Sequence, residues 1–108
     1  MSNTEHYILC RLRSSELKKF RPAVIHPFGW EGLDFFVHRP ITTVLDGIPV
    51  YSAVFWVVTS VDTGMSLPVK NATTIEEAKR QAVDVLNGLG IDKVKEAIER
   101  GKQIEVKV

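Results

Sequence analysis

Cysteine is nearly absent from this chain, which has one, Cys10, among 108 residues. No disulfide can form within one molecule, so a reducing cytoplasmic environment is the expected location and Cys10 is expected to be a buried structural thiol. Long apolar runs are also missing, and none approaches the ~20 residues that a membrane-spanning helix needs. The N-terminal Met-Ser-Asn-Thr-Glu-His lacks the basic and then apolar pattern of a signal peptide. We therefore expect a soluble cytoplasmic protein without a membrane partner.

Neither sign of charge dominates, because 14 Lys and Arg residues stand against 13 Asp and Glu residues, a formal net charge of +1. No global field attracts nucleic acid or anionic membranes. The hydrophobic content of 44% and charged content of 25% are typical of a globular domain, and we interpret residues 1–108 as a single domain. The histidines, His6, His26 and His38, do not have metal-site spacing, so we expect neither a metal nor a cofactor.

The middle of the chain contains its densest block of β-branched and aromatic residues, residues 53–61, which predicts a strand. Both faces of this strand are largely apolar, as in a strand that is covered on both sides. Asp62-Thr63-Gly64 predicts a short turn, because Gly64 can adopt the positive φ that a three-residue hairpin requires. A returning strand is predicted over residues 65–69.

The N-terminal half has a mixed pattern. Residues 6–13 alternate roughly and predict a first strand, and residues 14–20 suit one or two helical turns capped by a serine. Residues 21–34 contain two prolines and two glycines, which predicts an irregular segment. A short apolar run, Leu33–His38, predicts another strand.

Asp46-Gly47 is one of the stronger short hairpin signals. It predicts a hairpin with strands at Ile41–Leu45 and Ile48–Tyr51. Pro49 places the second of these strands at a sheet edge, because proline cannot donate to a neighbouring strand.

The C-terminal third is helical in pattern. Thr74, three residues before Glu77, predicts a helix start, and apolar residues recur at helical spacing until Gly88 and Gly90 end the helix. A shorter helix is predicted from Asp92 to Gly101, and residues 104–108 alternate as a last strand. The fold class is therefore α+β, with an antiparallel sheet of about 4–5 strands, two C-terminal helices packed on one face and a final short strand.

Val61-Asp62-Thr63-Gly64-Met65-Ser66 resembles the hydrophobic-Asp-Thr-Gly-(Ala/Ser)-(Ser/Asp) signature of the aspartic proteases. In the retroviral type each subunit of a homodimer supplies one aspartate, so the resemblance implies a catalytic Asp62. The chain departs from that family at Met65, where a small residue is usual, and in placing the motif past mid-chain. Asp, Thr and Gly are also ordinary turn residues. We interpret the motif as a hairpin turn and expect no enzymatic activity.

The second half also resembles part of the double-stranded-RNA-binding domain, in which two strands precede a helix that starts with Lys-Lys-x-Ala-Lys. Here Ala78 and Lys79 match, but the acids Glu76 and Glu77 precede them and the two lysines are missing. Carboxylates there repel phosphate, so this resemblance fails where the function of that family lies.

A basic segment near the N-terminus, with two aromatic residues shortly after it, suits single-stranded nucleic acid. Its residues are Arg11, Arg13, Lys18, Lys19, Arg21, Phe28 and Trp30. In this hypothesis the cations contact phosphates and Trp30 stacks on a base. The alternative is that the cations form an ordinary solvated surface.

The preferred hypothesis is a non-enzymatic domain that binds another protein chain, either a different protein or a second copy in a homodimer. Two helices cover only one face of a small sheet, so the other face requires a partner. The expected interface residues are Val54, Phe55, Trp56 and Val58. If instead the loop containing Phe28 and Trp30 covers that face, the protein is a monomer.

Overall fold

The computed structural model describes residues 6–12 and 14–102. Within them the strands are β1 (Ile8–Arg11), β2 (Leu17–Phe20), β3 (His26–Trp30), β4 (Leu33–His38), β5 (Ile41–Leu45), β6 (Ile48–Tyr51) and β7 (Val57–Ser60), followed by the helices α1 (Ile75–Leu89) and α2 (Ile91–Lys102). The α+β class predicted from the sequence is confirmed. The final strand predicted over residues 104–108 lies outside the described residues.

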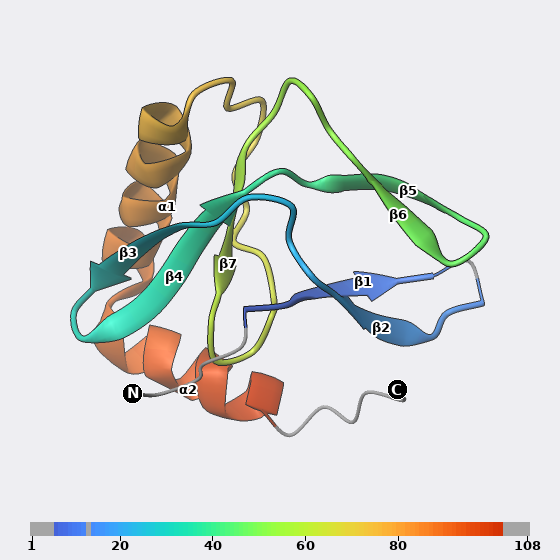
Figure 1. Cartoon of the computed structure of the whole chain (residues 1–108). Coiled ribbons are helices and arrows are strands. Elements are labelled where there is room, and N and C mark those ends of the chain that lie inside the picture. The colour runs from blue at the N-terminus through green and yellow to red at the C-terminus, as the bar shows by residue number, and fades with distance from the viewer. Residues whose placement is uncertain (1–5, 13, 103–108) are drawn as a thin grey trace, which may run out of the picture.

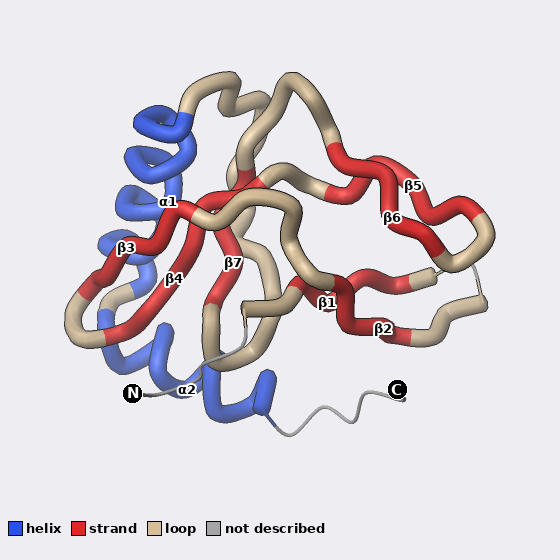
Figure 2. The backbone as a smooth tube through the Cα atoms, in the orientation of Figure 1, coloured by secondary structure: helices blue, strands red, loops and turns tan. Residues whose placement is uncertain are grey.

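The strands form three small antiparallel sheets rather than the one sheet expected. The central sheet has the order β3-β4-β7, and the hairpins β1-β2 and β5-β6 are separate two-stranded sheets. Figure 1 shows both hairpins extending to the same side of the molecule, away from α1, and in Figure 2 their strands are the red segments apart from those of the central sheet. The β5–β6 arm leaves the central sheet after His38 and returns at Val57, and these two residues are register partners.

The helices cover one face of the central sheet. Thr74 caps α1, accepting the Glu77 N–H at 3.1 Å, and Gly90 ends it, as predicted. Ala78, Ala82 and Leu86 of α1 are fully buried against the sheet. Among the residues described, no helix has the length and apolar character needed to cross a membrane.

The opposite face of the central sheet is covered by the chain itself. Phe36 and Val61 on this face are buried and pack with Ile8, and Ile41 and Tyr51 from the base of the β5–β6 arm complete the cluster. The 21–34 segment does not provide this cover; the N-terminal strand and the hairpin do. The uncovered face from which we inferred a protein partner, either a different protein or a second copy, is therefore absent from the described part of the protein.

Residues 14–20 belong to a hairpin, so the predicted helical turns are wrong. Ser15 has a φ of 68°, which a right-handed helix cannot contain. The Ser15 N–H donates to the Leu12 carbonyl at 2.9 Å, and the Leu12 N–H donates to the Glu16 carbonyl at 2.8 Å. This turn reverses the chain and directs residues 17–20 into β2.

The segment predicted to be irregular contains β3. A two-residue turn, Glu31-Gly32 with φ values of 51° and 78°, joins β3 to β4. In such a hairpin the hydrogen-bonded pairs alternate from the turn outward, which places Pro27 opposite Phe36 in a pair that needs no N–H. Pro27 is therefore compatible with β3 because β3 is an edge strand.

The strand predicted over residues 53–61 is shorter than expected. Only Val57–Ser60 form β7, because the Ser52 hydroxyl accepts from the amides of Val54 and Phe55, both at 3.1 Å, and closes a turn there. The turn at Asp62-Thr63-Gly64 is confirmed, with Gly64 at a φ of 72°. The returning segment makes one bridge, Thr59↔Ser66, in place of the predicted strand.

Candidate functional site

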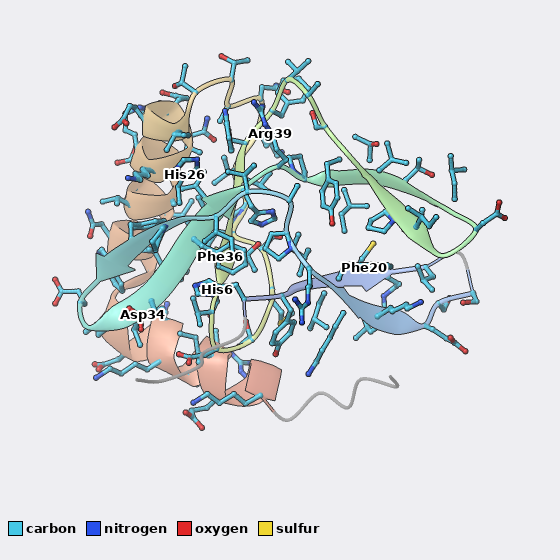
Figure 3. The ribbon with its side chains drawn as sticks, viewed as in Figure 1. His6, Phe20, His26, Asp34, Phe36 and Arg39 are labelled. Atoms are coloured by element: carbon cyan, nitrogen blue, oxygen red, sulfur yellow. The ribbon has the colours of Figure 1, made fainter. Side chains whose placement is uncertain are left out.

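A cleft lies between the two hairpin arms, with a volume of about 740 Å³. We call it the inter-hairpin cleft. It is lined by Cys10, Arg11, Leu12, Ser14 and Lys18 from the β1–β2 side and by Ile41, Thr42, Thr43, Val44, Leu45 and Gly47 from the β5–β6 side. Figure 3 shows Phe20 between the two arms, and its side chain is buried.

One wall of the cleft is the whole length of β5. Successive side chains of a strand point to opposite faces, so a wall made of five consecutive residues includes the backbone edge of the strand. The Asp46-Gly47 turn has φ values of 51° and 79° and sets the register, with Leu45 opposite Ile48. This alternation turns the N–H and C=O of Val44 away from β6.

The outward backbone groups of Val44 are the next feature of this wall. Among the described residues, no hydrogen bond of a turn, loop or side chain involves the Val44 amide. Its partner across the hairpin is Pro49, which has no N–H to donate on the far edge of β6. The two edges of this hairpin therefore differ, because the edge of β5 can accept a further strand and the edge of β6 lacks a donor at that position.

The other wall of the cleft is basic. Arg11 donates from Nη1 to the Ser15 carbonyl at 2.7 Å, which holds its guanidinium beside the β1–β2 turn. Lys18 is exposed, and its Nζ lies 5.5 Å from the centroid of the Phe20 ring. Among the described residues, no acidic side chain lines the cleft; Glu16 and Asp46 are exposed in the hairpin turns beyond it. Cys10 is half-buried rather than buried and faces the same space.

The structure separates the basic residues predicted to bind nucleic acid. Arg11 and Lys18 line the cleft, whereas Lys19 points to the other side of β2, with Nζ 4.4 Å from the Tyr7 ring centroid. Arg21 is exposed beyond β2, and its carbonyl accepts the Tyr51 hydroxyl. Arg13 lies outside the described residues.

The aromatic residues of that prediction lie on the helix side of the central sheet. Trp30 donates from Nε1 to Asn87 Oδ1 of α1 at 3.0 Å, and Phe28 stacks on Phe35 with ring centroids 5.6 Å apart. Both pack against the main core. They do not join Arg11 and Lys18 in one surface.

The residues predicted to form an interface are also divided. Val58 is completely buried in the core, whereas Val54 and Phe55 are exposed in the turn before β7. Trp56 is half-buried beneath Arg39, and His26 meets its ring edge-on at 5.4 Å between centroids. Of these four residues, only Val54 and Phe55 are exposed, so the apolar surface that they present is small.

A row of hydrogen-bonded polar side chains, buried at His38 and Thr59, crosses the central sheet, and sequence reasoning missed it. His38 contacts the Arg39 carbonyl through Nδ1 at 3.0 Å and the Thr59 hydroxyl through Nε2 at 2.5 Å. A carbonyl only accepts, so Nδ1 carries the proton and Thr59 donates to Nε2. Thr59 can then accept from the Ser66 hydroxyl, 3.2 Å away. Burial lowers the pKa of His38, although its bond to the Arg39 carbonyl opposes that shift. These hydrogen bonds link β4, β7 and the segment after the 62–64 turn.

Metal chemistry finds no support in the described residues, which contain no group of three His, Cys, Asp or Glu side chains placed to hold an ion. Asp62, the aspartate of the protease-like motif, is exposed on its turn. The sequence predicted each wall of the cleft separately, as the hairpin at 41–51 and as the basic segment at 11–21. The approach of the two hairpins is a long-range feature that no local pattern encodes.

Comparison with known proteins adds no assignment: the chain matches no protein-family model, no curated protein and no solved structure.

Proposed function

We propose that the protein is a non-enzymatic binding domain whose inter-hairpin cleft holds an extended segment of another protein chain. The observation that carries this proposal is that the entire strand β5 lines the cleft. A strand of five residues is about 17 Å long, so this wall is an elongated one. An elongated wall with a strand edge suits a polypeptide better than a compact small molecule.

The chemistry of the lining also favours a polypeptide over single-stranded nucleic acid. Proteins that bind single strands stack aromatic side chains on the bases. The lining contributed by residues 6–12 and 14–102 contains no aromatic residue, and Phe28 and Trp30 are on the other side of the central sheet. The aliphatic side chains of Leu12, Ile41 and Val44 instead offer apolar contact to alternate side chains of an extended segment.

The experiment starts from a phage-displayed library of random peptides of about ten residues, long enough to span β5 with flanking residues. Because Cys10 is the only cysteine and lines the cleft, its alkylation by iodoacetamide reports occupancy directly. We expect selection to enrich peptides that bind the native protein and reduce the Cys10 alkylation rate in proportion to the bound fraction. The same peptides should leave the urea-unfolded protein unprotected.

Three other outcomes have definite meanings. Failure to enrich any peptide, or enrichment of peptides that leave Cys10 reactive, would contradict binding in the cleft. Protection by a single-stranded oligonucleotide at low salt, lost at high salt, would favour the nucleic-acid alternative. A fall in Cys10 reactivity with protein concentration alone would identify the other chain as a second copy, as in a homodimer.

A further inference from the structure

We infer that the segment held in the cleft is acidic and adds to β5 as a further antiparallel or parallel strand. This inference rests on the proposed function and concerns the mode of binding and the chemistry of the partner. It follows from two independent features of the cleft, the hydrogen-bonding capacity of the β5 edge and the sign of the charge opposite it.

The first feature is the contrast between sheet edges. A strand edge with unpaired N–H and C=O groups accepts another strand, and proline at an edge prevents this. The outer edges of β3 and β6 contain Pro27 and Pro49. Each proline lies in a pair without hydrogen bonds, so the position where an N–H would point outward has no donor. β5 has no proline, and Val44, whose backbone N–H and C=O turn away from β6, lines the cleft. Of these three edges, the one able to pair is therefore that of β5, which borders the cavity.

The second feature is the charge of the facing wall. Arg11 and Lys18 line the cleft, and no carboxylate from the described part of the chain does. A bound strand that carries acidic side chains toward β1–β2 gains charge-assisted contacts with Lys18, which shares the face of its register partner Cys10. Its side chains on the apolar side meet Leu12, Ile41 and Val44. The occupant that fits is an extended segment in which apolar and acidic residues alternate.

Substitution at Val44 tests strand addition with a matched pair. Val44→Pro removes the outward N–H, and the β5–β6 ladder does not use it because Val44 lies opposite Pro49 in a pair without hydrogen bonds. Val44→Ala removes most of the side chain and keeps the N–H. We expect Val44→Pro to weaken binding of a selected peptide at least about fivefold more than Val44→Ala does, the factor that one net hydrogen bond provides. Equal losses in the two variants would overturn strand addition.

A measurement on the unmodified protein covers the case in which Val44→Pro fails to fold. Hydrogen exchange of the Val44 amide, followed by NMR with and without saturating peptide, should slow markedly on binding. The Leu45 amide, which already faces β6 within the hairpin, is the internal reference. An unchanged Val44 exchange rate with bound peptide would overturn the proposal.

The charge of the partner is tested by Lys18→Glu, with Lys19→Glu as its control. The two lysines are adjacent but lie on opposite faces of β2, and only Lys18 lines the cleft. The selected peptides should be enriched in Asp and Glu, and Lys18→Glu should weaken them by about tenfold. Lys19→Glu should change the affinity less than about twofold. Enrichment of basic or neutral peptides, or equal effects of the two substitutions, would contradict an acidic partner.

These results separate the two levels of inference. If peptides bind and protect Cys10 but Val44→Pro and Val44→Ala are equivalent, the proposed function stands and strand addition is wrong. If no peptide protects Cys10, both are wrong.

Discussion

The guanidinium carbon of Arg39 lies 3.7 Å from the centroid of the Trp56 ring. Arg39 directly follows β4 and Trp56 directly precedes β7, so the stack joins the two ends of the chain segment that carries the β5–β6 arm. Arg39 also donates from Nη1 to the Phe55 carbonyl at 3.3 Å. This cation–π contact fixes the base of the arm against the central sheet.

Replacing the cation should loosen that base. We expect Arg39→Gln to lower the free energy of unfolding by about 0.5–1 kcal/mol, the range of a partly exposed cation–π contact, and to shift tryptophan emission to longer wavelength. Urea titration monitored by fluorescence measures both effects. Arg21→Gln, at an exposed arginine, is the matched control and should be nearly neutral. An equal effect of the two substitutions would show that the stack contributes nothing to stability.

Gly64 has a structural requirement beyond its conformation. It adopts a φ of 72°, and a Cβ at this position would lie 2.7 Å from Cδ2 of the Tyr7 ring. Gly47 has a similar φ of 79°, but a Cβ there meets no atom within 4 Å.

The comparison between these two glycines isolates the steric effect. Gly47→Ala should cost about 1 kcal/mol from the left-handed backbone alone. Gly64→Ala should cost about 1–3 kcal/mol more, because Tyr7 must also move. Unfolding midpoints in urea provide the measurement, and equal costs would show that Tyr7 moves aside freely.

The buried His38 gives stability a pH dependence. Its pKa is lowered in the folded protein from the ordinary value of 6.5, mainly by burial. The unfolded chain therefore takes up a proton at this residue more readily than the folded protein does. Its contribution to stability is fully present above about pH 6.5 and is lost as the pH falls through the lowered pKa.

A histidine-free variant at this position tests that dependence. Urea midpoints measured between about pH 7.5 and about pH 5 should decline on acidification in the unmodified protein and decline less in His38→Gln. The other ionisable groups are the same in both proteins, so the difference between the two slopes belongs to His38. Parallel slopes would show that His38 takes up its proton equally well in the folded state.

Elements with a strong local signal were predictable from the sequence. Asp46-Gly47 positioned the β5–β6 hairpin, and the predicted bounds Ile41–Leu45 and Ile48–Tyr51 are those observed, because this turn accommodates only one register. The Thr74 cap and the apolar spacing after it located α1. In each case the deciding interaction lies within a few residues of the signal.

Prediction failed where distant residues decide the structure. Pro27 and Gly29 suggested an irregular segment, yet pairing with β4 makes their segment a strand. The alternation of His26, Phe28 and Trp30 was the available signal for β3. Residues 14–20 contain good helix formers, but the left-handed Ser15 and the pairing with β1 override that preference.

The candidate site depended even more on long-range structure. Arg11 and Lys18 were singled out from composition, but the register of β1 with β2 determines that Lys18 faces the cleft and Lys19 does not. The identity of the second wall depends on where the β5–β6 arm lies in space. The number and spacing of charges along the sequence determine neither which lysine faces the cleft nor which element forms its second wall.

The β5–β6 arm is inserted between two paired residues of the central sheet. The chain leaves the sheet after His38 and re-enters it at Val57, and these two residues lie opposite each other. The length of such an arm can change without altering the spacing of β4 and β7. Only its base, where Ile41 and Tyr51 cover Phe36, is constrained by the core. The outer part, from Thr43 to Val50, is therefore the part of the scaffold that can be lengthened, shortened or exchanged while the helices and the central sheet stay unchanged.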